Sequence, residues 1–230
     1  MNHAGIATST SFMGPEPKLT NALYTVIDGL GLKIELPIPK RNWRLPKLDP
    51  VSPPPFSSDW IREKILHPGA LDGMNEEARA ILLICLNTGA RPSEVATLLP
   101  DRIRLEAGTA HIQIRADGRV VKTKRAQRDI PLVGVALEAA KDFPHGFPRY
   151  RDNPSSLSGA QLKFMRSNDL MESEDHVVYS LRHSFEDRML IAKFPERVKA
   201  DLMGHNIDRE RYGEGLPLAD QAKLLEEISF

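Results

Sequence analysis

Two arginines of the chain occupy positions from which a guanidinium could bind a phosphate. Arg91 lies between Gly89, where a helix is predicted to end, and Pro92, which suits the first position of the next helix. A helix start attracts anions through its free N–H groups and its dipole, and a guanidinium adds a bidentate, permanently charged fork. Arg182 lies in YSLRHSF, residues 179–185, whose apolar spacing is typical of the middle of a helix with one buried face. A charged side chain beside such a face is either solvated or directed at an anion.

Each arginine also has an ordinary structural interpretation. On local grounds alone, Arg91 is better explained as a surface side chain paired with Glu94, three positions later. Arg182 could form a salt bridge with Glu186, one helical turn further on. Neither arginine by itself therefore indicates a site.

A hairpin-like segment carries the densest cluster of positive charge. The sequence VVKTKRAQRDIPL contains Lys122 and Lys124, at or beside a turn predicted at Asp117-Gly118. Four arginines accompany the two lysines: Arg115, Arg119, Arg125 and Arg128. A solvated, lysine-rich strand edge is the common explanation for such a pattern, and binding to a nucleic-acid backbone is the functional one.

A histidine and a tyrosine follow late in the chain. His205 comes directly after Gly204, and Tyr212 lies seven positions later, before Gly213. A histidine after a helix-ending glycine is usually a capping or surface residue, and a tyrosine in a polar segment is usually a surface aromatic. A tyrosine can instead attack phosphorus if neighbouring cations stabilise its phenolate.

The elements that must position these side chains are mainly helical. Ser57 caps a helix over 57–66, Asn75 and Gly89 bound a second helix, and Pro92 opens a third. Residues 102–132 then alternate in polarity, which predicts a small antiparallel sheet. Further helices are predicted over 133–143, 158–171, 180–194, 195–204 and 218–230. The fold class is mainly α with a small antiparallel β-sheet (α+β).

The composition is that of an ordinary globular protein, with a formal net charge of +0 that neither requires nor excludes a polyanionic partner. Prolines concentrate in residues 35–56, an extended linker or arm, and one helix is predicted before it within 16–32. We therefore expect an N-terminal part, 1–55, and a compact domain, 56–230. Cys85 stands alone in an apolar run, so no intrachain disulfide is possible, which fits a cytosolic protein. Neither a signal peptide nor a membrane-spanning stretch is expected.

Taken in order, four motifs resemble those of the tyrosine recombinases, the phage integrase family. The segment LLICLNTGARPSEVATL is similar to the one that carries the family's first catalytic arginine, here Arg91. KTKRAQRDIPL is similar to its hairpin lysine, for which Lys122 is favoured over Lys124. SLRHSF resembles the segment of the second arginine, Arg182, and LMGH followed by a tyrosine before glycine resembles the terminal histidine and nucleophile, His205 and Tyr212. The resemblance runs from about residue 56 to the end.

The resemblance implies an integrase-like fold and phosphoryl transfer on double-stranded DNA with no metal and no other cofactor. Tyr212 would attack a phosphodiester to give a 3′-phosphotyrosyl link and a free 5′-hydroxyl. Arg91 and Arg182 would hold the non-bridging oxygens, and Lys122 would protonate the leaving oxygen. His205 would bind the phosphate or handle the tyrosine proton. The sequence itself shows no histidine and carboxylate cluster at metal-ligand spacing.

Two positions depart from the family pattern. The family usually has histidine three positions before the second arginine, where this chain has Tyr179, and His183 is a neighbouring secondary candidate. The segment from His205 to Tyr212 is also shorter than is common in the family. These departures leave open a degenerate relative that binds DNA without cutting it. A type IB topoisomerase-like enzyme and a helical interaction module with accidental motifs are further alternatives.

The resemblance also carries expectations about assembly and location. Residues 1–55 would be the remnant of a core-binding domain or a linker. The tail after Tyr212 is apolar enough to pack and would dock onto a neighbouring protomer, giving a homo-oligomer on DNA. The protein would be cytoplasmic in a bacterial cell and associated with the nucleoid.

Overall fold

The computed structural model describes residues 26–27, 29–33, 52–116, 127–205 and 213–230. The chain divides into two compact units, Met1–Ser52 and Pro53–Phe230. The helix predicted within 16–32 and the turn predicted at 117–118 lie wholly or largely outside the described residues. The elements below belong to the second unit.

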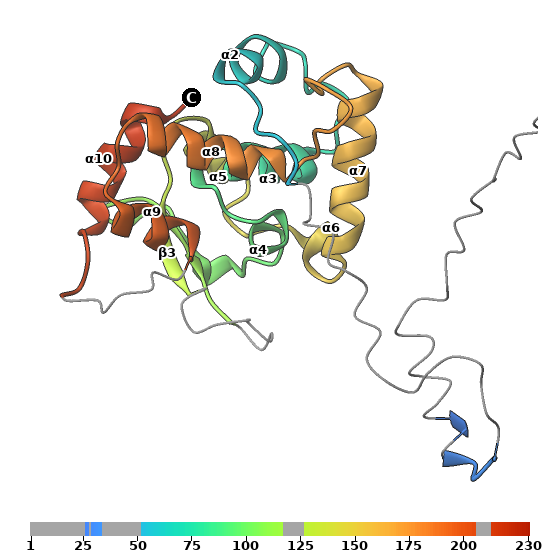
Figure 1. Cartoon of the computed structure of the whole chain (residues 1–230). Helices are drawn as coiled ribbons and strands as arrows, with labels where there is room; N and C mark the ends of the chain where they lie inside the picture. Colours follow the sequence, from blue (N-terminus) through green and yellow to red (C-terminus); the bar gives the residue numbers. More distant parts are fainter. Residues whose placement is uncertain (1–25, 28, 34–51, 117–126, 206–212) are drawn as a thin grey trace, which may run out of the picture. The chain divides into compact units, whose positions relative to one another are not determined.

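The second unit is mainly helical with one small sheet (Figure 1). The helices are α2 (Ser58–Trp60), which continues into a π-helical turn (Ile61–Ile65), α3 (Glu76–Thr88), α4 (Pro92–Ala96), a 3₁₀ turn (Pro100–Arg102), α5 (Gly134–Asp142), α6 (Pro148–Arg151), α7 (Pro154–Ser167), α8 (Ser180–Ile191), α9 (Glu196–Met203) and α10 (Leu218–Ile228). The strands are β1 (Ile103–Arg104), β2 (His111–Ile114) and β3 (Arg128–Pro131). This arrangement confirms the predicted fold class.

The sheet is antiparallel with the strand order β1-β2-β3. Ile112 on β2 pairs with Ile103 on one side and with Ile130 on the other. Ile112 and Ile130 are fully buried, because period-two alternation places them on the face that packs against the core. Strand β1 follows α4 by way of the 3₁₀ turn, and β3 packs against α9.

Helix α3 forms the centre of the unit and packs against α5, α8, α4 and α7. The Asn75 side chain accepts a hydrogen bond from the Ala78 N–H at its start, and Gly89 ends it in the left-handed conformation. A side chain at Gly89 would collide with the buried Phe185 ring of α8, so two helices meet here at a distance that only glycine permits. The predicted limits of α3 are therefore confirmed.

Helix α7 is displaced from its predicted range of 158–171, and helix α8 ends at Ile191, before the predicted 194. Helix α7 begins at Pro154 and not at 158, because proline suits a first helical position, and it ends at Ser167 before Asp169 adopts a positive φ. Helix α8 begins at Ser180, as predicted, with Tyr179 at its cap position, so residues 179–185 form the start of a helix and not its middle. Arg182 therefore lies in the first turn of α8, near the turn that ends α3.

Candidate functional site

Arg182 is buried at the junction of three segments. Its side chain is almost fully covered, with the residue 3% exposed. One nitrogen of its guanidinium donates to the carbonyl of Gly89, and the other donates to the carbonyl of Met203 at 2.6 Å. The second nitrogen also contacts Nε2 of His205 at 3.1 Å. A solvated Arg182 paired with Glu186 is therefore wrong: its guanidinium instead joins the ends of α3 and α9.

The contact with Arg182 determines the protonation state of His205. A guanidinium can only donate, so Nε2 of His205 must accept and its proton must sit on Nδ1. Burial, followed by the charge of Arg182, lowers the pKa of His205 below its ordinary value. His205 is therefore a neutral imidazole near pH 7, and its Nδ1–H remains as a donor.

Arg91 and Glu94 form the second part of the site, at the start of α4. Oε2 of Glu94 accepts from the backbone N–H of Arg91 at 2.9 Å, and Oε1 accepts from its guanidinium at 2.9 Å. The predicted Arg91–Glu94 pair is therefore confirmed. Burial alone would lower the pKa of Arg91, but the charge and hydrogen bond of Glu94 outweigh it and raise the pKa. The Arg91 side chain is 38% exposed, so part of its fork faces outward.

Glu94 also binds Arg128, which the sequence placed in an exposed DNA-binding patch. The Arg128 side chain is only 5% exposed, pairs with Oε2 of Glu94 at 2.8 Å and donates through Nε to the Leu202 carbonyl. This burial corrects the expectation of an exposed Arg128. The alternating pattern of β3 turns its side chain toward α4 and α9, where it connects the two segments that carry Arg91 and His205.

The three guanidiniums lie close enough to influence one another. Burial is the main cause that lowers the pKa of Arg182, and the positive charges of Arg91 and Arg128 lower it further. Among the described residues, the carboxylate of Glu94 pairs with Arg91 and Arg128, and its charge also acts on Arg182. The group therefore has surplus positive charge, and its exposed edge is at Arg91. A phosphate group would offset that charge.

Tyr179 lies at the edge of this group. The residue is 38% exposed, and its ring packs edge-on against the His183 ring, with the centroids 5.4 Å apart. A hydrogen bond from Arg91 to Tyr179 contributes to the raised pKa of Arg91. Tyr179, Arg91 and residues of α7 line a hollow of about 260 Å³. Tyr179 therefore stands beside the arginines, where the usual family pattern would place a histidine.

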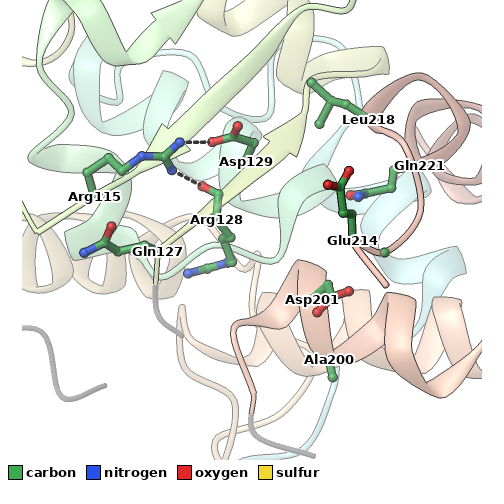
Figure 2. Close-up of a pocket in the computed structure, with 10 residues that line it drawn as sticks. Arg115, Gln127, Arg128, Asp129, Ala200, Asp201, Glu214, Leu218 and Gln221 are labelled. Atoms are coloured by element: carbon green, nitrogen blue, oxygen red, sulfur yellow. Dashed lines mark hydrogen bonds and ion pairs between the residues drawn. The ribbon is translucent and has the colours of Figure 1, made fainter. Parts of the chain in front are cut away.

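Arg115, the other described member of the predicted basic patch, faces a different hollow. Figure 2 shows this pocket of about 510 Å³ between β3, α9 and residues 214–221. Arg115 pairs with Asp129 at 2.5 Å and donates to the Arg128 carbonyl, and the carboxylates of Asp201 and Glu214 also line the pocket. These carboxylates make the hollow a poor place for a DNA backbone. Arg115 is therefore held within the protein by an ion pair.

Several predicted site residues lie outside the described residues. They are Lys122, Lys124, Arg119, Arg125 and Tyr212. Within the described ranges, no group of three histidine, cysteine, aspartate or glutamate side chains is placed to hold a metal ion. In the same ranges, no helix is both long and apolar enough to cross a bilayer.

The sequence does not indicate that Glu94 and Arg188 organise the site. Local spacing predicts Glu94 only as a partner of Arg91, because its contact with Arg128 joins segments that are far apart in the chain. Arg188 is 7% exposed. It lies seven positions after Leu181 on the stripe that also carries Phe185, so helical periodicity could have indicated its burial.

Comparisons with known proteins indicate the family of the chain. The model of the phage integrase family matches residues 64–210. A tyrosine recombinase XerC from Neisseria meningitidis is 26% identical over 182 residues, which cover 73% of this chain and 55% of that protein. The chain thus spans little more than half the length of this curated relative.

Two solved structures share the fold. The integrase from mycobacterium phage Brujita superposes with a TM-score of 0.53 at 18% identity, covering 91% of this chain and 69% of that one. The Tn1549 transposon integrase, solved in complex with transposon right end DNA, superposes with a TM-score of 0.51 at 17% identity. The match covers 88% of this chain and 70% of that one.

Proposed function

Because the chain belongs to the phage integrase family, we propose that it is the catalytic part of a site-specific DNA recombinase. It cuts and rejoins double-stranded DNA through a 3′-phosphotyrosyl intermediate. The observation that carries this proposal is the group formed by Arg91, Arg182 and His205, which has surplus positive charge and an exposed edge. A phosphodiester is the anion that such a group suits in a DNA substrate.

Arg182 and Arg91 have different roles in binding the phosphate. Arg182 is fixed by two backbone carbonyls, so its guanidinium does not have to reorganise when negative charge builds up on the non-bridging oxygens of the phosphate. Arg91 is half-exposed and its fork is oriented by Glu94, so it meets the incoming phosphate first. His205 keeps Arg182 in place through Nε2 and offers its Nδ1–H to a phosphate oxygen.

The covalent step exchanges one ester for another. The Tyr212 oxygen forms a bond to phosphorus as the bond to the 5′-oxygen breaks. The tyrosine proton passes to water, and Lys122 supplies a proton to the leaving 5′-oxygen. Because the phosphotyrosyl link conserves the ester, a different 5′-hydroxyl can reverse the step and join new strands. Arginines and a lysine supply the positive charge, with no metal and no other cofactor in these roles.

We expect a covalent protein–DNA complex on a suitable nicked duplex, because the short strand released next to the nick cannot religate. The target sequence is open, so the substrate is a library of nicked duplexes with randomised flanks. Linked DNA is recovered after denaturing electrophoresis and sequenced. Tyr212→Phe is the matched control, because it lacks only the nucleophilic oxygen and should give no linked DNA.

A DNA-binding protein that no longer cuts is the second candidate. Tyr179 favours it, because a phenol is a poor proton carrier near pH 7 at a position where the family usually has histidine. This candidate predicts recovery of bound DNA from the same library under native conditions but no linked DNA after denaturation.

The protein assembles as a homo-oligomer on DNA in this proposal, with the tail as the contact between protomers. In the structure the tail packs on its own chain: α10 lies against β3 and Leu225 is fully buried. Docking of the tail onto a neighbouring protomer therefore requires α10 to detach from β3 of its own chain. Light scattering should show a monomer without DNA and a larger species on recovered target DNA, and a monomer under both conditions would contradict the exchange.

The proposed DNA substrate also implies where in the cell the protein works. A DNA recombinase of this kind works in the bacterial cytoplasm, associated with the nucleoid. Co-sedimentation with nucleoids from gently lysed cells would check this location, and recovery in the nucleoid-free supernatant alone would contradict it.

A further inference from the structure

The helix that carries Arg182 also carries Arg188, a second buried arginine that has no role in the proposed chemistry. The two nitrogens at the end of its guanidinium donate to the carbonyls of Leu86 and Ile228, and one also reaches Oδ1 of Asn87 at 3.3 Å. Arg188 therefore joins α8 to the end of α3 and to the end of α10.

Arg182 and Arg188 bind the same turn of α3 from one helix. Arg188 binds Leu86 and Asn87 in the last turn, and Arg182 binds the carbonyl of the capping Gly89. The carbonyls at the end of a helix have no partner within it and lie at its negative pole, which favours cations there. The chain reaches Arg91 only two residues after Gly89, so the position of this turn affects both phosphate-binding arginines.

Among the described residues, the Arg188 guanidinium forms no salt bridge; its contacts are hydrogen bonds to uncharged groups and the Phe230 ring. Its printed partners are two carbonyl groups and one side-chain amide, and its Nε has no hydrogen-bond partner in the described part of the chain. Burial lowers its pKa to about 10. Apolar side chains of similar volume often replace buried ions without loss of stability. The hydrogen bonds by which Arg188 fixes neighbouring segments therefore explain its presence better than a contribution to the stability of the fold does.

The same network holds the residues at the end of α10. The Phe230 ring lies 4.5 Å from the Arg188 guanidinium. Asn87 donates to the backbone oxygens of Phe230 and Val133 and accepts from the Phe230 N–H. Asn87 and Arg188 thus contact both the last turn of α3 and Ile228–Phe230.

We propose that Arg188 is a positioning residue, which holds the last turn of α3 so that Arg91 and Arg182 converge on one phosphate. Because Arg188 also binds the end of α10, this geometry depends on Ile228–Phe230 remaining packed in their observed place. The consequence for strand cleavage rests on the proposed function. The consequence for the position of Arg182 does not, and it can be measured without DNA.

The test is the variant Arg188→Met, which removes the charge and the hydrogen bonds but keeps an unbranched apolar side chain. NMR titration of His205 reports the position of Arg182, because Arg182, Glu186, Arg91 and Arg128 are the charges that act on this imidazole. In the variant, the pKa of His205 should rise toward its ordinary value as Arg182 withdraws. Covalent complex on the nicked library should fall roughly 10- to 100-fold, the effect of a displacement of about 1 Å.

Met165→Ala is the matched control, because Met165 is fully buried in α7 and belongs to neither network. It should lower stability while leaving the His205 titration unchanged. Phe230→Ala should shift the His205 titration in the same direction as Arg188→Met, but less. If Arg188→Met does not fold, Arg188→Lys, which keeps the charge without the planar fork, takes its place and should give the same shift.

An unchanged His205 titration in a folded Arg188 variant would overturn the proposal, whatever happens to cleavage. If the parent protein forms no covalent complex at all, the proposed function fails, and the His205 titration still decides whether Arg188 positions Arg182.

Discussion

Replacing Arg182 with lysine is expected to reduce the yield of covalent protein–DNA complex by about 100- to 1000-fold. The guanidinium of Arg182 reaches the carbonyls of Gly89 and Met203 and the ring of His205 from one rigid plane. A lysine keeps the charge but has a single ammonium, which cannot make these contacts and also face a phosphate. The measurement is trapping on the DNA recovered from the nicked library, with binding followed in parallel.

The matched control is Arg79→Lys, the same substitution at an arginine whose side chain is 51% exposed. It should change the yield of covalent complex by less than about twofold, since exposed pairs contribute little. Binding of Arg182→Lys to the same DNA should fall much less than its cleavage, because one phosphate contact among many is affected. Near-parental cleavage by folded Arg182→Lys would show that this guanidinium does not act on the reacting phosphate.

The variant Glu94→Gln is expected to lower the free energy of unfolding by about 2–4 kcal/mol at pH 7. Its carboxylate is shared by Arg91 and by Arg128, whose side chain is only 5% exposed. A neutral amide would leave the buried Arg128 charge uncompensated. Urea denaturation measures the change. Glu138→Gln, the same substitution in an exposed pair with Lys141, should cost less than about 0.5 kcal/mol.

The pH dependence of the free energy of unfolding is a second measurement of the stabilising role of Glu94. Burial alone would raise the pKa of Glu94, but hydrogen bonds and charge from Arg128 and Arg91 outweigh it and lower the pKa from 4.5 to about 2. A carboxyl whose pKa falls on folding contributes stability that is complete above 4.5 and is lost as pH falls toward 2. The stability difference between parent and Glu94→Gln should therefore shrink between pH 5 and pH 2, as estimated from that linkage. A difference no larger than that of Glu138→Gln at pH 7 would contradict the role of Glu94.

Local signals predicted the ends of α3 and the start of α4. Asn75, Gly89 and Pro92 act through hydrogen bonds and backbone angles within a few residues, so their effect can be read from the chain. The alternation that buries Ile112 and Ile130 is local in the same sense. These signals are enough for the fold class and for the place of Arg91.

The partners of the charged side chains could not be predicted in this way. Arg182 binds carbonyls of residues 89 and 203, which come together only when α3, α8 and α9 pack. Arg128 sits in a basic segment that suggests exposure, yet the register of β3 turns it into the protein toward Glu94. A count of nearby positive charges cannot distinguish an arginine that faces DNA from one that holds two segments together.

The most direct test of the central claim is to identify the amino acid that carries the DNA. Covalent complex recovered from the nicked library is digested with nuclease and trypsin, and the peptide with a nucleotide remnant is located by mass spectrometry. We expect the remnant on Tyr212, linked through a 3′-phosphate, with none in Tyr212→Phe. A remnant on another residue, or its persistence in Tyr212→Phe, would contradict cleavage by Tyr212, as would DNA that is bound but never linked.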